Sequence, residues 1–218
     1  MKICQEKIDF MDQISKYTFD ELDLTDRYKL LSSLPKHFKV GAEIGVWEGW
    51  YTFQILERTN MHIFAIDPWA DTKGYPDPPN KDKDFDPLAV GPDGFVWHET
   101  RYMSTYANLM NAPRDRWTIF RSFSYDTVYF FEDKQMDFVY IDGDHLYDAV
   151  IKDMRDWWPK VNIGGILAGH DYNDNNPGTI QAVNEFAIQN NLEFKVTGTS
   201  PEKGDADAPS WVFIRNEE

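Results

Sequence analysis

The chain has 218 residues, of which 42% are hydrophobic and 16% aromatic, enough for one sizeable core and too many for a disordered chain. Its 37 acidic residues outnumber the 22 basic ones, and the formal net charge of −15 disfavours a nucleic-acid or anionic membrane partner, although acidity also serves solubility alone. One cysteine, Cys4, excludes an internal disulfide, the first residues are too acidic for a signal peptide, and no apolar run reaches membrane-spanning length, so we expect a soluble, cytoplasmic protein.

The chain begins with a helical segment followed by two apolar runs. We expect residues 1–38 to form an amphipathic helical segment ahead of the first strand. Residues 39–46 and 61–67 are the first two apolar runs, and the second ends at Asp67. Runs of this length that are rich in β-branched and aromatic residues predict buried strands.

Residues 68–100 interrupt this rhythm and are long for a loop inside a compact domain. Such a loop is either a lid over a site or a disordered segment, and both interpretations stay open. The aromatic residues of the segment favour a lid, because a fully solvated loop has little use for them. The prolines and aromatics in question are Pro76, Pro78, Pro79, Pro87, Pro92, Trp69, Tyr75, Phe85, Phe95 and Trp97.

The second half of the chain alternates strands with helices. Three runs, at 117–123, 136–142 and 163–171, predict strands, and residues 148–161 carry apolar side chains at helical spacing. The predicted buried face of that helix consists of Val150, Met154, Trp157 and Trp158, and Pro159 with the Gly164–Gly165 pair is expected to end the helix and turn into the next strand.

Strands that alternate with helices predict an α/β domain with a doubly wound, mostly parallel sheet. The tail departs from the alternation, because residues 193–200 and 210–216 look like two strands of an antiparallel hairpin. We therefore predict one domain over residues 39–218, preceded by the segment 1–38 and interrupted by the lid-like insertion 68–100.

A glycine-containing turn follows the first strand. Gly45 would permit a tight turn there, and Gly49 would let a ligand approach the backbone closely. Asp67 ends the next strand, 22 residues after Gly45, where a carboxylate can accept both hydroxyl hydrogens of a ribose. Either feature alone is common in loops, but together they predict a nucleoside site.

The charge of the turn separates two nucleoside ligands. A pyrophosphate prefers a helix N-terminus without nearby negative charge, whereas this turn carries Glu43 and Glu48. S-adenosylmethionine is cationic at its sulfonium and amino groups. The turn therefore favours S-adenosylmethionine over NAD.

Acidic and imidazole side chains follow the fourth and fifth predicted strands. Asp142, Asp144 and His145 follow one strand, and His170 and Asp171 follow the other. Adjacent parallel strands would bring all five to one rim, where like charges need partners or a bridging cation. Such a cluster suits Mg²⁺, Mn²⁺ or Ca²⁺, but Asp and Gly also favour plain turns, and His170 is a possible helix cap.

The stretch IDGDHLYDAVIKDMRDWWPKVNIGGILAGHDY resembles the signature of small-molecule O-methyltransferases, a family that includes macrolide-sugar, aminocoumarin-sugar and cephalosporin-biosynthesis methyltransferases. The stretches EIGVWEGWYT, FAIDPW and SWVFIR resemble the family's glycine-rich turn, ribose strand and last strand. The resemblance implies a seven-stranded Rossmann-like sheet with S-adenosylmethionine as methyl donor.

The resemblance also implies roles for individual residues. For the sugar-modifying members it implies a divalent metal, Mg²⁺ or Mn²⁺, and Asp142 and Asp171 match its ligand positions. The chain departs from that pattern at His170, where the sugar enzymes tend to carry an acid, so His170 is either a third ligand or a partner that orients Asp171. Ser122 and Ser124 lie where the family places the adenine.

These observations predict O-methylation of a small-molecule acceptor. His145 is the first candidate for the general base, because imidazole titrates near neutral pH, and Asp144 is the second. The predicted donor contacts are Glu43, Gly45, Gly49, Asp67, Ser122, Ser124 and Asp142, and the predicted metal ligands are Asp142, His170 and Asp171.

Two alternatives and one partner remain open. An NAD-dependent oxidoreductase on the same fold is the first alternative, and a non-catalytic binding module that keeps the fold is the second. The acceptor is unidentified, and a homo-oligomer is compatible with the sequence.

Overall fold

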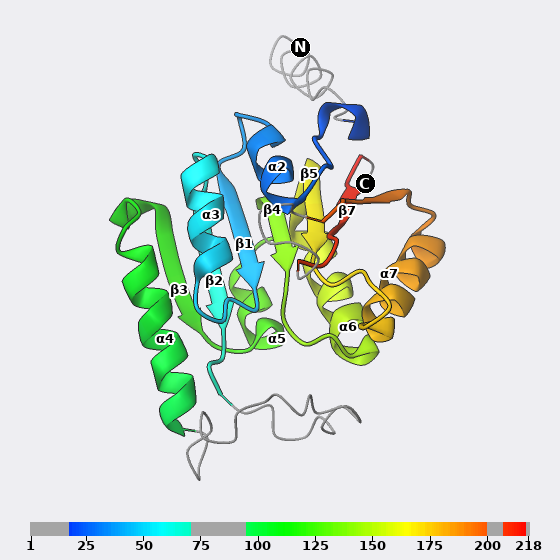
Figure 1. Cartoon of the computed structure of the whole chain (residues 1–218). Helices are drawn as coiled ribbons and strands as arrows, with labels where there is room; N and C mark the ends of the chain where they lie inside the picture. Colours follow the sequence, from blue (N-terminus) through cyan, green and yellow to red (C-terminus); the bar gives the residue numbers. More distant parts are fainter. Residues whose placement is uncertain (1–17, 71–94, 200–206, 217–218) are drawn as a thin grey trace.

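The computed structural model describes residues 18–70, 95–199 and 207–216, and of residues 95–97 it describes the backbone only. It contains a seven-stranded sheet in the order β3-β2-β1-β4-β5-β7-β6, with helices on both faces (Figure 1). The strands are β1 Val40–Ile44, β2 His62–Asp67, β3 Trp117–Arg121, β4 Met136–Ile141, β5 Val161–Gly169, β6 Phe194–Val196 and β7 Trp211–Ile214. The helices are η1 Phe19–Glu21, α2 Arg27–Ser33, α3 Trp50–Arg58, α4 Phe95–Leu109, η2 Arg114–Arg116, α5 Ser124–Thr127, η3 Val128–Phe130, α6 Tyr147–Trp157, η4 Trp158–Lys160 and α7 Pro177–Asn190.

The sheet confirms the doubly wound α/β prediction. Strands β1 to β5 run parallel to one another. Strand β7 pairs antiparallel with both β5 and β6, and its pairing with β6 confirms the predicted hairpin of the tail. The chain leaves β1 toward one edge of the sheet and returns at β4 on the other side of β1. Open sheets bind ligands where the strand order reverses in this way, at the carboxyl ends of the strands.

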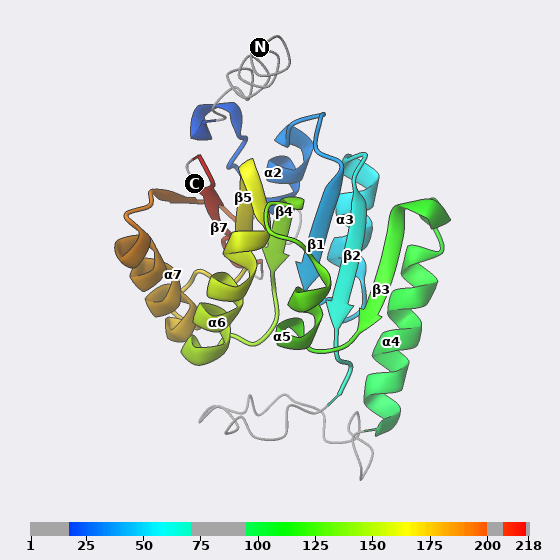
Figure 2. The same cartoon turned by 180° about the vertical axis from the view of Figure 1, so that it is seen from behind.

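Two hydrophobic cores cover the two faces of the sheet. Helices α2, α3 and α4 lie on one face (Figure 1), where Leu30, Ile55 and Trp117 are fully buried. Helices α5, α6 and α7 lie on the opposite face, which Figure 2 shows from behind. The spacing in α6 confirms the predicted helix, because Val150, Met154 and Trp157 all point into this second core.

Two of the predicted segments lie only partly within the described residues, so their prediction stays untested as a whole. From residue 18 onward the N-terminal segment forms only η1 and α2, and residues 1–17 lie outside the described residues, as does Cys4. The segment 95–100 belongs to α4, so only 71–94 of the expected lid lies outside the described residues. No helix among the described residues is long and apolar enough to cross a membrane.

One expectation from the sequence is wrong, the turn at the Gly164–Gly165 pair. The pair lies inside β5 instead of turning into it, and Gly164 has a φ of 77°. Between Met136 and Phe138 of β4, the partner strand advances from Val161 to Ile166, so the extra residues form a bulge in β5. Glycine adopts a positive φ without strain and so suits this irregular part of the strand. The glycine pair, which predicted a turn from the sequence, therefore marks a bulge inside β5.

The turn after β1 packs directly on the turn after β4. Gly45 has a φ of 84°, and a Cβ on it would lie 2.3 Å from the Asp142 carbonyl oxygen and 2.4 Å from the Gly143 Cα. Only glycine therefore fits this position, for both backbone conformation and space. Gly143, on the opposite side of the contact, has open space around it, with 3.9 Å to the Gly45 Cα.

We predict that Gly45→Ala lowers the free energy of unfolding by about 1–3 kcal/mol or more, because a methyl group would overlap with the backbone of the β4 turn. Chemical denaturation with circular dichroism measures the effect. Gly143→Ala is the matched control and should remain within about 1 kcal/mol of the wild type, because its methyl group has room. Equal stability of the two variants would contradict the packing argument.

Candidate functional site

The carboxyl ends of β1, β2 and β4 surround a cavity of about 420 Å³. Of the predicted donor contacts, Gly45, Asp67, Ser124 and Asp142 line this cavity, and so does the predicted catalytic residue Asp144. Aromatic and aliphatic side chains form much of the remaining wall: Ile44, Trp47, Ile66, Trp69, Phe123 and Tyr125. The structure therefore brings these four predicted donor contacts to one cavity at the carboxyl edge of the sheet, and donor binding there stays a prediction.

Asp67 lines this cavity and ties together the two loops beside it. Its Oδ2 accepts hydrogen bonds from the backbone N–H groups of Val46 and Trp47, both at 2.9 Å, and its Oδ1 accepts one from Trp69 N–H at 2.7 Å. Burial raises the pKa of Asp67, and these hydrogen bonds oppose the increase. Each carboxylate oxygen can accept more than one hydrogen bond, so the group ties two turns together and still faces the cavity.

Trp47 and Trp69 adopt left-handed backbone conformations, with φ of 56° and 41°. Bulky residues rarely adopt such angles, and when they do, the surrounding structure enforces them. Trp69 Nε1–H donates to the Trp47 carbonyl at 2.7 Å, and the Thr105 hydroxyl of α4 donates to the same carbonyl at 2.8 Å. Trp47 is 49% exposed and lines the cavity, and the guanidinium carbon of Arg101, another lining residue, lies 4.9 Å from the centroid of its ring.

Gly49 is required for a reason that differs from the sequence expectation. Its φ is 74°, and a Cβ on it would lie 2.8 Å from the Thr105 methyl group. The group that approaches Gly49 closely is therefore a side chain of α4. Asn108 of α4 also donates to the Glu48 carbonyl at 2.8 Å, which fastens the same helix to the turn. Donor contact by Gly49 stays a prediction.

Two further predicted donor contacts lie off the cavity wall. Glu43 is 1% exposed within β1 and accepts a hydrogen bond from the Thr52 hydroxyl of α3, and burial raises its pKa well above the ordinary value. Ser122 does not line the cavity, whereas Ser124 does. Ser124 donates to Asp153, a cavity residue that the sequence analysis missed because it lies among the acids of α6. Burial raises the pKa of Asp153 to about 6.

A second group of polar side chains gathers beside the cavity, at the ends of β4 and β5. His145 Nε2 lies 2.9 Å from Asp171 Oδ2, and His170 Nδ1 lies 3.2 Å from the same oxygen. His170 Nδ1 is also 3.5 Å from Asp142 Oδ1. Four of the five residues predicted to meet at this rim are therefore in mutual contact.

Asp144 belongs to the turn instead. Its Oδ1 accepts the backbone N–H of Leu146 at 2.9 Å, as an acid in a tight turn commonly does. Its side chain lines the cavity, so its place as second candidate for the general base stays a prediction.

The structure adds two residues that the sequence analysis did not identify. Arg27, at the start of α2, has its Nη2 2.8 Å from Asp207 Oδ1 and its Nη1 3.6 Å from Asp142 Oδ2. Asp207 Oδ1 is in turn 3.4 Å from His170 Nε2. No local pattern could reveal these contacts, because 115 residues separate Arg27 from Asp142 in the chain.

The charges of this group shift its pKa values in opposite directions. The hydrogen bond to Asp171 raises the pKa of His145. Burial alone would raise the pKa of Asp171, but hydrogen bonds from His145 and His170 hold it well below its usual range. Burial would lower the pKa of His170, but the Tyr140 hydroxyl and the nearby carboxylates hold it well above its usual range. The group thus forms a network of paired charges.

The predicted metal ligands meet, but they do not fit a hard divalent cation. One ligand atom each from Asp142, His170 and Asp171 lies within 4.8 Å of the others, which is close enough for a shared ion. However, both ring nitrogens of His170 already lie close to carboxylates, Nδ1 to Asp142 and Asp171 and Nε2 to Asp207. In addition, the Arg27 guanidinium already approaches Asp142. Mg²⁺ prefers oxygen ligands in octahedral geometry, and it would lie beside a permanent positive charge.

Comparison with known proteins gives a consistent result. A family model described as a methyltransferase domain matches residues 42–172. No curated protein matches the chain in sequence.

Many solved structures share the fold, and three of them illustrate the similarity. A protein from Corynebacterium glutamicum is 12% identical, over 99% of this chain and 98% of its own, with a TM-score of 0.58. The O-methyltransferase NovP is 19% identical, over 83% of this chain and 72% of its own, with a TM-score of 0.54. An rRNA methylase from Streptococcus thermophilus is 11% identical, over 87% of this chain and 94% of its own, with a TM-score of 0.55. At such identities the likeness shows the fold alone.

We predict that Asp67→Ala weakens binding of S-adenosylhomocysteine by about 1–3 kcal/mol, the range for losing hydrogen bonds to a charged group. Isothermal titration calorimetry on the folded variant measures this. Because three backbone N–H groups also lose their acceptor, the variant should unfold more easily than the wild type.

Asp137→Ala is the matched control for that loss of stability. Asp137 accepts the backbone N–H groups of Lys39 and Val40 at the opposite end of β1, far from the cavity. It should lose stability and keep its ligand affinity. A folded Asp67→Ala protein with wild-type affinity would remove Asp67 from the binding site.

Proposed function

Because the chain belongs to the family of methyltransferase domains whose model spans residues 42–172, we propose that it transfers the methyl group of S-adenosylmethionine to a hydroxyl of a small molecule. The observation that carries the proposal is the cavity of about 420 Å³ at the carboxyl ends of β1, β2 and β4, with the Asp67 carboxylate in its wall and the His145–Asp171 pair beside it.

The cavity suits a cationic nucleoside. Asp67 supplies acceptors for the ribose hydroxyls, and the Phe123–Tyr125 wall with Ser124 supplies an apolar slot with polar groups for the adenine. Phe123 and Tyr125 stack with ring centroids 5.1 Å apart. Asp142 and Asp144 provide the negative potential that favours the sulfonium and amino groups of the donor.

The chemical step needs alignment and one proton acceptor. The bond between sulfur and the methyl carbon breaks as the bond from the acceptor oxygen forms, and the sulfonium becomes the thioether of S-adenosylhomocysteine. His145 Nε2 faces Asp171, which leaves Nδ1 as the ring atom that takes the hydroxyl proton. Asp171 orients the imidazole and stabilises its protonated form, as a carboxylate beside a catalytic histidine does.

The proposal includes no Mg²⁺ or Mn²⁺. A metal would lower the pKa of the acceptor hydroxyl and orient it. Its ligands would be Asp142, His170 and Asp171, which already engage Arg27, His145 and one another.

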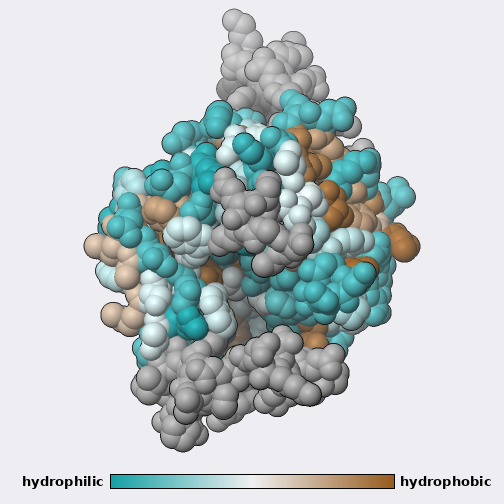
Figure 3. Space-filling view, viewed as in Figure 1, coloured by the Kyte–Doolittle hydropathy of each residue, from teal (hydrophilic) through white to brown (hydrophobic). Residues whose placement is uncertain are grey.

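The charge of the chain favours a small molecule over RNA as acceptor. The net charge of −15 repels a phosphate backbone. Figure 3 shows hydrophilic residues with several hydrophobic patches among them on one face of the molecule. The fold alone supports both substrate classes, since NovP is an O-methyltransferase and another neighbour is an rRNA methylase. A homo-oligomer is compatible with this proposal.

Thermal-shift titration tests the donor and both alternatives at once. S-adenosylhomocysteine should raise the unfolding temperature in a concentration-dependent way, and NAD should not. Methyl transfer from labelled S-adenosylmethionine into a metabolite extract then tests catalysis. Stabilisation by NAD alone would favour the oxidoreductase, and donor binding without any labelled product would favour a non-catalytic module.

We predict that His145→Ala lowers turnover by about 10²–10⁴-fold, the usual contribution of a general base. Donor affinity should not change, because His145 does not line the donor cavity. Single-turnover kinetics with an acceptor from the extract screen, beside calorimetry with S-adenosylhomocysteine, separates the two effects.

His37→Ala is the matched control, because His37 is exposed just before β1, at the opposite end of the sheet. It should keep wild-type turnover. If His145→Ala retained full turnover, the base would have to be another group.

A further inference from the structure

We propose that the guanidinium of Arg27 takes the place of a divalent cation in the acidic group beside the cavity, so that methyl transfer by this chain needs no metal. This inference rests on the proposed function only in assigning the group to the acceptor side of the cavity. Its test measures metal binding, which does not require turnover.

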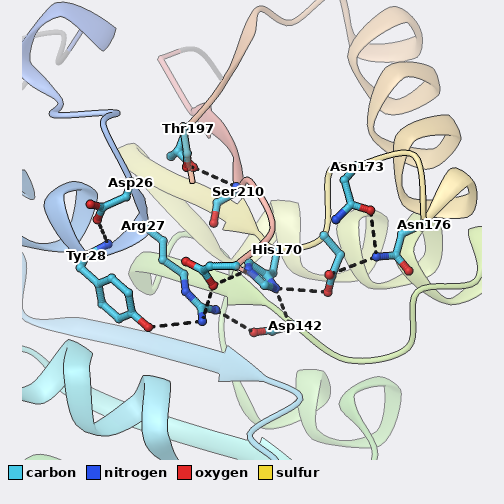
Figure 4. Close-up of polar contacts among 12 residues, drawn as sticks. Asp26, Arg27, Tyr28, Asp142, His170, Asn173, Asn176, Thr197 and Ser210 are labelled. Atoms are coloured by element: carbon cyan, nitrogen blue, oxygen red, sulfur yellow. Dashed lines mark hydrogen bonds and ion pairs between the residues drawn. The ribbon is translucent and has the colours of Figure 1, made fainter. Parts of the chain in front are cut away.

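Arg27 reaches the acidic group from a distant part of the chain. Figure 4 shows its side chain extending from α2 toward Asp142, next to His170. Its Nη1 lies 3.6 Å from Asp142 Oδ2, and its Nη2 lies 2.8 Å from Asp207 Oδ1. One permanent cation therefore lies between a carboxylate of β4's end and a carboxylate of the segment that leads into β7.

The position of Arg27 is fixed by its surroundings. Asp26 caps α2 by accepting hydrogen bonds from the N–H groups of Tyr28 and Lys29, both at 2.8 Å. These bonds fix the backbone of Arg27, which lies between Asp26 and Tyr28 in the chain. The guanidinium carbon lies 5.3 Å from the centroid of the Tyr28 ring and 4.9 Å from that of Tyr51. The Arg27 side chain is only 11% exposed, so it is a built part of the site and not a surface arginine.

The oxygens that a metal would need are already directed at other groups. Asp142 presents Oδ2 to Arg27 and Oδ1 to His170. Asp171 presents Oδ2 to both imidazoles, and its Oδ1 accepts from the Asn176 side-chain amide at 3.1 Å. A divalent ion would have to break these contacts and would then lie close to the Arg27 charge.

Arg27 also has a positive role in the proposed reaction. Asp142 lines the donor cavity, so the residue that holds its Oδ2 sets the direction of a carboxylate at the methionine end of the donor. Through Asp207, the same guanidinium ties the C-terminal segment to the rim. Arg27 is therefore a positioning residue, which acts through Asp142 and Asp207.

The test uses Mn²⁺ as the probe, on the full chain after treatment with EDTA. Paramagnetic resonance of free Mn²⁺ reports binding, and a thermal shift with S-adenosylhomocysteine on the same samples reports the donor site. We expect no Mn²⁺ binding by the wild type and unchanged donor binding in EDTA. Wild-type binding of Mn²⁺ that Asp171→Asn abolishes would overturn the proposal. Absence of donor binding would instead refute the proposed function and leave the metal result intact.

Variants of Arg27 test directly whether its positive charge takes the place of a metal ion. Arg27→Gln removes the charge and should bind Mn²⁺ measurably, at least about tenfold more tightly than the weakest binding that the assay would detect in the wild type, because the carboxylates lose a neighbouring cation. Arg27→Lys keeps the charge and should resemble the wild type. A folded Arg27→Gln protein without any gain in Mn²⁺ affinity would contradict the proposal. If Arg27→Gln does not fold, Mn²⁺ binding is measured on the wild type and on Arg27→Lys, and binding by either would contradict the proposal.

Arg58→Gln is the matched control. Arg58 lies over the same Tyr28 ring, at 5.4 Å, and its other contact is with the Gln54 side chain, away from Asp142 and Asp207. Its removal should leave Mn²⁺ binding as in the wild type. An equal gain in Arg58→Gln would mean that net charge, and not the place of Arg27, decides metal affinity.

Discussion

The Asp67 carboxylate is the interaction on which the site depends. It accepts hydrogen bonds from three backbone N–H groups in the two loops that follow β1 and β2, and so fixes both loops at the wall of the cavity. These hydrogen bonds offset the cost of the left-handed backbone conformations of Trp47 and Trp69. Helix α4 adds to this scaffold from outside, because Thr105 donates to the Trp47 carbonyl. A ribose that binds there meets groups already in place, so little ordering is left for the ligand to bring about.

Parallel strands impose a second constraint, because they deliver their polar ends to one rim. Here that rim receives the carboxylates of Asp142 and Asp171, and partly buried carboxylates are costly unless a positive charge or hydrogen-bond donors compensate them. A bound cation is one solution, and side-chain cations are another. This chain brings Arg27 and two histidines into contact with the carboxylates, and Asp207 joins them from the C-terminal segment. The rim thereby pairs the carboxylates of Asp142, Asp171 and Asp207 with Arg27 and two imidazoles, and these groups come from four distant parts of the sequence.

Glycine has two separate tasks in the turn after β1. Gly45 is needed because the turn after β4 packs against it, and Gly49 is needed because Thr105 of α4 does. Both tasks concern contact between protein segments, although the sequence pattern suggested contact with a ligand at Gly49. The packing at Gly45 determines how closely the turns after β1 and β4 approach each other at the edge of the cavity.

Local periodicity was enough to predict the strands, the buried face of α6 and the antiparallel tail, because alternation and helical spacing depend only on neighbouring residues. It also placed Asp67, Asp142 and Asp171 at strand ends, and adjacency in a parallel sheet then brought the last two together. It did not predict that Glu43 and Ser122 lie off the cavity wall, that the Gly164–Gly165 pair forms a bulge, or that Arg27 and Asp207 join the acidic group. These features depend on which distant segments pack together, and the tertiary structure alone decides that, since long-range contacts leave no periodic trace in the sequence.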